Sequence, residues 1–153
     1  MKEFDYELDY KRLDFTDEET RKLYRIGRGE QGVLLVRPYT DDICAHWRFK
    51  TPEIAVNSAN KILSMYLGYM VDGDFIGMDM CRKFLEMGFT RSRRYANHRD
   101  GKKYDKKGNI IPQEKDHATC HFAKSANIFK KVRDIVAKNE TYVKMRKEWR
   151  SEE

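Results

Sequence analysis

The stretch that most constrains the fold is 51–98, where apolar residues recur at helical spacing. Thr51 is a suitable N-cap, and Pro52 suits the first helical position, where its missing N–H costs nothing. Gly73 interrupts the pattern, which resumes two residues later. The sequence therefore predicts two long consecutive helices, the second ended or bent at Gly88 and then continued as a basic helix.

Three shorter segments have the patterns of strands. Residues 4–10 alternate aromatic or aliphatic side chains with acidic ones, 33–36 are a short apolar run, and 46–50 place Trp47 and Phe49 on one face. We expect that face to pack on the helices. The sequence therefore predicts a single α+β domain over 1–153, with a small antiparallel sheet of about three strands covered by three or four helices.

The remaining segments are assigned from their caps and turn residues. Thr16 and Glu19 fit a capping box that opens a short helix ending near Tyr24. Glycines and a proline among lysines predict an exposed basic loop over about 99–112. A long last helix is expected from Ala118, with a charged and frayed end over 144–153.

Composition limits the class of protein. The chain has 153 residues, 40% hydrophobic and 37% charged, which fits one folded domain and leaves no apolar run long enough for a membrane span. Three scattered cysteines form no disulfide framework, and the acidic N-terminus lacks the pattern of a secretory signal. We therefore expect a cytoplasmic protein that does not enter membranes.

Positive charge is concentrated in one tract. Residues 91–107 carry eight basic and two acidic side chains, a net charge of +6, whereas the other 136 residues carry 23 of each sign. The first 19 residues are acidic, so the chain is electrically polarised. This distribution favours an anionic partner, either nucleic acid (DNA or RNA) or another polyanion.

The tract also contains the groups that contact nucleic acids. Arginine binds phosphate oxygens through two nitrogens, and an aromatic ring stacks on an unpaired base. If the tract is helical, its residues at positions 91, 94, 95 and 98 share a face. The alternative is a solvated basic face that pairs with Asp5, Glu7 and Asp9. The candidate nucleic-acid-binding residues are Arg91, Arg93, Arg94, Tyr95, His98, Arg99, Lys102 and Lys103, with Arg28 and Arg48 as additional anion contacts.

Other motifs point less directly to chemistry. Residues 27–32 match G-x-G-x-x-G, but a helix precedes them and a strand is expected after them, the reverse of a dinucleotide-binding turn. We expect these glycines to turn the backbone. His117, Cys120 and His121 have the spacing of one helical face, and Cys44 and His46 could complete a metal site with them only if the fold brings all of them together. We predict no metal and no cofactor. We identify no catalytic residue.

Several long segments carry a family resemblance: FDYELDYKRLDF, YRIGRGEQGVLLVRPY, HWRFKTPEIA and DFIGMDMCRKFLEMGFTRSRRYANHRDGKKYD. They resemble a family of small uncharacterised proteins, a domain of unknown function found in bacteria, eukaryotes and tailed phages. The resemblance covers most of the chain up to about Lys107. It implies a phage or microbial origin in the cytoplasm of a cell, and it assigns no role to any residue.

Three functions therefore stay open. The first is a non-enzymatic nucleic-acid-binding protein that contacts the phosphate backbone through 91–107. The second is an enzyme that acts on a phosphorylated or nucleotide substrate between the 27–32 loop and the 91–99 arginines, and a pocket that holds Glu30, His46 and Arg94 would favour it. The third is a protein-interaction module, such as a phage factor that binds a host protein.

Overall fold

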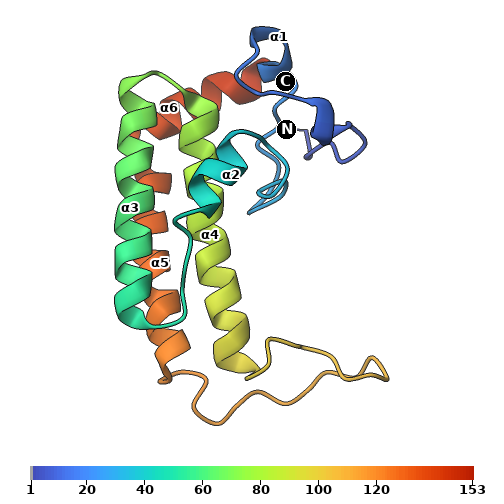
Figure 1. Cartoon of the computed structure of the whole chain (residues 1–153), viewed down its shortest axis with the longest axis vertical. Coiled ribbons are helices and arrows are strands. Elements are labelled where there is room, and N and C mark those ends of the chain that lie inside the picture. The colour runs from blue at the N-terminus through green and yellow to red at the C-terminus, as the bar shows by residue number, and fades with distance from the viewer. Residues whose placement is uncertain (1) are drawn as a thin grey trace.

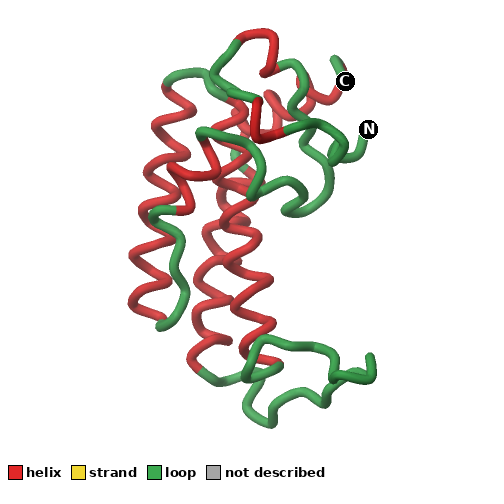
Figure 2. Tube along the Cα trace, turned by 45° about the vertical axis from the view of Figure 1, so that its right-hand side comes forward, coloured by secondary structure: helices red, strands yellow, loops and turns green. Residues whose placement is uncertain are grey.

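The computed structural model describes residues 2–153, and over that range the chain folds into helices without a sheet (Figures 1 and 2). The predicted α+β class with a three-stranded antiparallel sheet is therefore wrong. A single bridge between Tyr104 and Ile110 is the one β-type pairing of the described chain. The helices are η1 (Tyr10–Arg12), α1 (Glu18–Arg21), α2 (Tyr39–Cys44), α3 (Pro52–Val71), α4 (Phe75–Asn97), α5 (His121–Lys138) and α6 (Glu140–Ser151).

The two long consecutive helices are confirmed. Thr51 caps α3 by accepting from the amide of Ile54 at 3.2 Å, with Pro52 in the first turn. Asp74 caps α4, and α4 continues without a break through Gly88. Helix α5 passes very close there: a Cβ on Gly88 would lie 2.4 Å from the Phe129 ring. This glycine therefore serves helix packing, and the predicted end or bend is wrong.

The C-terminal segment differs from the prediction of one long helix with a frayed end. Asn139 ends α5 and caps α6, because its side chain accepts from the amide of Tyr142 at 3.0 Å. Helix α6 then runs to Ser151. Trp149 donates to the carbonyl of Tyr24 at 3.0 Å, and Arg150 donates to that of Gly27 at 2.9 Å. These bonds hold the end of the chain against the N-terminal segment.

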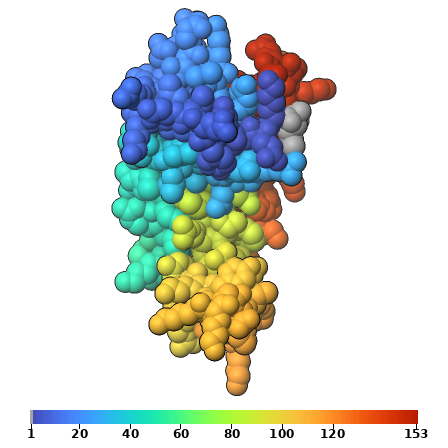
Figure 3. Space-filling view, turned by 90° about the vertical axis from the view of Figure 1, so that its right-hand side faces the viewer, coloured from blue at the N-terminus to red at the C-terminus, as the bar shows by residue number. Residues whose placement is uncertain are grey.

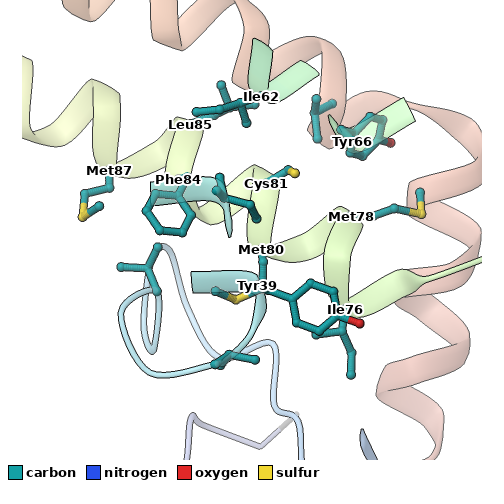
Figure 4. Packing of buried hydrophobic residues seen from close by; sticks show 14 of the residues in the cluster. Tyr39, Ile62, Tyr66, Ile76, Met78, Met80, Cys81, Phe84, Leu85 and Met87 are labelled. Carbon is teal, nitrogen blue, oxygen red and sulfur yellow. The ribbon is translucent and has the colours of Figure 1, made fainter. Parts of the chain in front are cut away.

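Helices α3, α4 and α5 pack against one another as a bundle, and α4 also contacts α2 and α6 (Figure 1). Figure 4 shows the centre of this core, where Ile62 and Tyr66 of α3 lie near Cys81 and Leu85 of α4. Both termini and α6 lie at one end of the bundle, whereas residues 98–120 project at the other (Figures 1 and 3). We call this projecting segment the basic arm.

The alternating segment 4–10 is irregular chain and not a strand. Its aromatic rings instead continue a row of stacked side chains: Phe4 packs on Tyr10 at 5.4 Å between ring centres, and Tyr10 packs on Phe15 at 6.0 Å. Asp5 accepts from the amide of Glu7 and so closes a local turn. Phe4 and Tyr10 are buried, but Tyr6 between them is 58% exposed, so the period of two does not mark one continuous buried face.

The other two predicted strands are also wrong. In 33–36 the amide of Leu35 donates to the carbonyl of Gly32, and Thr40 donates to the carbonyl of Val33 at 2.9 Å. In 46–50 one side chain, Ser58 of α3, bonds both the carbonyl of His46 and the amide of Arg48. Turns and side chains thus satisfy the backbone groups that a sheet would need.

Two local predictions have mixed outcomes. Trp47 and Phe49 do pack on the helices, with the Trp47 ring 6.4 Å from that of Phe84. The short helix near residue 18 exists, but Asp17 caps it by accepting from the amide of Thr20, and the predicted Thr16 does not. Thr16 instead donates to Asp14 at 2.6 Å.

Candidate functional site

The tract 91–107 is divided between two structural settings. Its first seven residues form the last turns of α4, and the remaining ones, 98–107, form the first part of the basic arm. The arm folds back on itself, since the amide of Ile111 donates to the carbonyl of Lys103 at 2.8 Å and that of Asp105 to the carbonyl of Asn109 at 2.9 Å. Its tip is therefore a tight reversal (Figure 1). The lysines of this tip are exposed.

The helical part exposes two of its three arginines. Arg91 and Arg94 are exposed and form no ion pair with any residue of 2–153. Arg93 turns toward the arm, where it donates to the Asn97 side chain at 2.8 Å and to the carbonyl of His117 at 3.0 Å. Arg93 thus holds the return limb of the arm on α4.

The shared helical face expected for positions 91, 94, 95 and 98 is only half exposed. The Tyr95 ring lies 5.7 Å from Phe49 and 5.3 Å from Phe122 and packs beneath Gly101. His98 is buried, with 6% of its surface exposed. The structure therefore places Tyr95 and His98 at the base of the arm, where they fix its direction.

In the arm, only the first cation is paired. Arg99 lies 3.8 Å from Glu114, whose carboxylate also accepts from the Arg99 amide. The lysines at the tip are exposed and form no ion pair within the described chain, and one of them, Lys103, lies over the Tyr104 ring at 5.7 Å. Six of the eight basic side chains of the tract are therefore exposed and unpaired: Arg91, Arg94, Lys102, Lys103, Lys106 and Lys107.

The acidic N-terminal segment lies at the opposite end of the molecule from the arm (Figure 3). Asp9 pairs locally with Arg12 at 3.4 Å, and Glu3 pairs with Arg28 at 3.4 Å. No ion pair in residues 2–153 joins Asp5, Glu7 or Asp9 to the tract. The intramolecular pairing considered from the sequence is therefore absent from the described structure.

The two additional arginines lie in different places. Arg28 and Arg91 line the same open groove of about 400 Å³, so the 27–32 loop does meet the start of the tract. Arg48 donates to the carbonyls of Cys44 and Trp47, at 3.2 and 2.6 Å. Its shallow groove also contains His46, and neither that groove nor the first contains Arg94. Glu30, His46 and Arg94 are thus not brought together.

The 27–32 loop is shaped by its glycines, as predicted. Gly27, Gly29 and Gly32 all have positive φ, a conformation that glycine adopts without a steric penalty. At Gly32 a Cβ would also lie 2.1 Å from the Phe4 ring. Two arginines bind the loop, since Arg82 donates to the carbonyl of Gly29 and Arg150 to that of Gly27, both at 2.9 Å.

A buried polar cluster beneath this loop was not predicted. Asp79 of α4 has no exposed surface and accepts from three side chains: Arg82 at 2.8 Å, Tyr142 at 2.6 Å, and Tyr24. Lys83 is also fully buried, with its ammonium 4.0 Å from Asp79. We call these five residues the Asp79 cluster.

The cluster shifts the pKa values of its members. Burial alone would raise the pKa of Asp79, but the charges of Arg82 and Lys83 and the hydrogen bonds to it lower that pKa to about 2. Burial lowers the pKa of Lys83 to about 7 against the opposing effect of Asp79. Burial and Asp79 together raise the pKa of both tyrosine hydroxyls. The cluster therefore contains an ionised carboxylate beside a lysine that titrates near neutrality.

A signal for this cluster is present in the sequence. Asp79 and Lys83 are four residues apart within an otherwise apolar helical stripe, so both side chains face the core. A charged pair at this spacing on a buried face predicts an internal ion pair. The tyrosine partners could not be assigned in this way, because they come from 55 and 63 residues away.

The histidines and cysteines form no site. In the described residues, no three His, Cys, Asp or Glu side chains gather so that they could hold a metal ion. His121 packs on Phe122 at 4.1 Å between ring centres, and all three cysteines are free thiols. No helix within 2–153 is long and apolar enough to cross a membrane.

Comparison with known proteins places the chain in one family. Neither the curated proteins nor the solved structures contain a match to it. A family model described as a domain of unknown function (DUF4385) matches residues 5–152, which is nearly the whole chain. This match extends past the segments that carried the resemblance and includes α5 and α6. The protein therefore belongs to the DUF4385 family.

Proposed function

We propose that the protein binds nucleic acid by contacting its phosphate backbone with the basic arm and the adjoining face of α4. One observation carries this proposal: six cations of the tract are exposed and have no acidic partner in the described structure. Unpaired cations at this density attract a polyanion and release its condensed counterions on binding. The tract is thus available to a partner.

The residue types favour backbone contact over base reading. Lysines at the arm tip supply point charges on flexible stems, and these charges bind phosphates without a fixed geometry. Arg91 and Arg94 project from a helix and present guanidinium groups that can bind phosphate oxygens through two nitrogens. Tyr95 packs in the core of the arm base, so we assign the contact to cations alone. Binding should therefore be tolerant of sequence.

The surroundings fit this proposal. The arm projects from the end of the bundle, where a long polymer can approach it without meeting the acidic N-terminal segment (Figures 1 and 3). Free thiols at all three cysteines fit a reducing compartment such as the cytoplasm. Nucleic acid is the abundant polyanion of that compartment, and we infer that it is the partner.

The test is fluorescence-anisotropy titration of labelled single- and double-stranded oligonucleotides at several salt concentrations. Six phosphate contacts give a slope of log affinity against log salt of about −5 on duplex DNA. Replacing Lys102, Lys103, Lys106 and Lys107 of the arm tip with alanine should reduce the slope by about 3 to 4. Replacing Arg91 and Arg94 should reduce it by about 2. Arg93 is left unchanged in both variants because it fixes the arm.

The matched control replaces four exposed lysines elsewhere with alanine: Lys130, Lys131, Lys138 and Lys144. This variant has the same net charge as the arm variant, so it separates a local site from the total charge of the molecule. The proposal requires that the control keep most of the affinity. Equal weakening of both variants, no binding at low salt, or equal affinity for heparin and oligonucleotides would overturn it.

A further inference from the structure

A second cationic feature lies at the opposite end of the molecule from the arm. The 27–29 loop and α6 enclose an open cleft of about 700 Å³, and no carboxylate lines it. Its walls carry five basic side chains: Arg28 from the loop, Arg82 from α4, and Arg146, Lys147 and Arg150 from α6. Segments far apart in the sequence thus converge on one positively charged cleft.

Two of these arginines, Arg82 and Arg150, are held in place by hydrogen bonds to carbonyl groups of the 27–29 loop. Arg82 donates through Nη1 to the carbonyl of Gly29 and through Nε to Asp79, and only 12% of its side chain is exposed. Arg150 donates through Nη2 to the carbonyl of Gly27, with 14% of its side chain exposed. Their guanidinium groups are therefore fixed before any ligand arrives, which lowers the entropy lost on binding.

One of these arginines also has a donor left over. Arg82 Nη2 has no hydrogen-bond acceptor within residues 2–153. Arg150 Nη1, in contrast, is buried and lies 3.6 Å from Glu153 Oε1, so this nitrogen faces away from the cleft. A guanidinium nitrogen of a largely buried arginine is favourable only where a ligand or water accepts from it. Arg82 thus offers a donor that suits an oxyanion.

The positive charges of the cleft are only partly balanced by nearby carboxylates. Asp79 lies behind Arg82, Glu153 behind Arg150, and Glu3 pairs with Arg28 at the rim. Arg146 and Lys147 are exposed and have no ion-pair partner in the described chain. The cleft therefore keeps about two uncompensated positive charges, which matches the charge of about −2 of a phosphate monoester near neutral pH.

We propose that this cleft binds the phosphate group of a small phosphorylated molecule, of about nucleotide size. The fixed guanidinium group of Arg82 can donate to phosphate oxygens, and the exposed Lys147 adds attraction at the mouth. The volume falls within the range of about 300–1,000 Å³ of small-molecule sites. Val143, which is exposed, and Ala137 provide apolar surface for the rest of the ligand. This site is separate from the nucleic-acid surface proposed for the arm.

The test is isothermal titration of the full chain with inorganic pyrophosphate and, separately, with ADP. We expect saturable binding with one site per chain. The double variant Arg146→Glu and Lys147→Glu should weaken it by about tenfold or more, since each change replaces an attractive charge with a repulsive one. Both residues are exposed on α6, and circular dichroism checks that the variant stays folded.

Two further variants separate this site from other sources of binding. Lys124→Glu with Lys131→Glu makes the same change in net charge at exposed residues of α5 that do not line the cleft, and it should leave pyrophosphate affinity within about twofold of wild type. The variant with alanine at Lys102, Lys103, Lys106 and Lys107 should also keep this affinity. The proposal fails if pyrophosphate does not bind, or if the charge control weakens it as much as the cleft variant. It also fails if the cleft variant lowers oligonucleotide affinity while no small phosphate binds.

Discussion

Replacement of Asp79 by asparagine tests whether the Asp79 cluster stabilises the fold. The carboxylate is fully buried and accepts hydrogen bonds from Arg82, Tyr142 and Tyr24. Asparagine keeps the shape but removes the charge that compensates Arg82 and Lys83. Removal of one partner of a buried ion pair costs about 3–5 kcal/mol, because the remaining charge is left unpaired. For a chain of this length, that corresponds to a fall in Tm of about 6–20 °C.

The direction of the pKa shift of Asp79 also indicates that the cluster favours the ionised carboxylate. The cluster lowers the pKa of this carboxyl from 3.8 to about 2, so the ionised form is favoured in the folded state by about 2 kcal/mol. A depressed folded-state pKa means that this stabilisation is present above about pH 4 and is lost as the pH falls toward 2. The variant lacks this titration, so the difference between the two proteins should narrow in acid.

The change is measured by urea denaturation followed through tryptophan fluorescence at several pH values. Trp149 reports on this region, because its ring stacks on Phe75 at 5.3 Å and packs edge-on against Tyr24 at 5.9 Å. Glu148→Gln is the matched control, since this residue is exposed on the same helix as Trp149. A loss below about 1 kcal/mol for Asp79→Asn, or an acid dependence equal to that of wild type, would refute the reasoning.

Two further predictions concern Lys83 and the helix interfaces. Burial lowers the folded-state pKa of Lys83 to about 7, so the unfolded state binds more protons between about pH 7 and 10 and wild-type stability should rise over that window. Lys83→Met should flatten this rise in Tm, and an unchanged slope would contradict the assignment. Gly88→Ala should lose about 1–3 kcal/mol by overpacking against Phe129, whereas Gly68→Ala, with open space around it, should gain about 0.5–1 kcal/mol in urea denaturation.

The helices could be predicted where local signals and packing agree. Thr51 and Pro52 mark the start of α3, and an apolar stripe follows them at the right spacing, so the element and its first residue were both correct. The break at Asn139 was missed because the apolar pattern continues across it. Asparagine is a good N-cap, and that signal alone indicates where α6 begins.

The strands were wrong because a pattern of burial does not specify its partner. In 4–10 the alternation of apolar and acidic residues accompanies a turn at Asp5–Glu7 that buries Phe4 and Tyr10 and leaves Tyr6 exposed. A sheet also needs a second backbone to accept its hydrogen bonds, and the structure supplies Thr40 and Ser58 side chains instead. These partners lie 7 and 12 residues from the groups they bond. Sequence periodicity contains no information about them.

The candidate sites show the same division between local and non-local information. Charge density alone located the arm, because an excess of cations over 17 residues is a property of the sequence. The pairing of individual cations was not predictable: Arg93 and Arg99 are engaged by the carbonyl of His117 and by Glu114, which only the folding back of the arm brings close. Of the eight basic side chains of the tract, six are thus exposed and without an ion-pair partner in the described structure.

The two cationic regions differ in what holds their charges, and this difference indicates how each should recognise an anion. The arm carries lysines on a projecting reversal, so its attraction should depend strongly on salt and weakly on the shape of the anion. The cleft carries arginines fixed by glycine carbonyls, and Asp79 aligns one of them from behind. Fixed donors discriminate by geometry. Asp79→Asn should therefore weaken pyrophosphate binding in the cleft under conditions where the variant stays folded, and it should leave oligonucleotide binding by the arm unchanged.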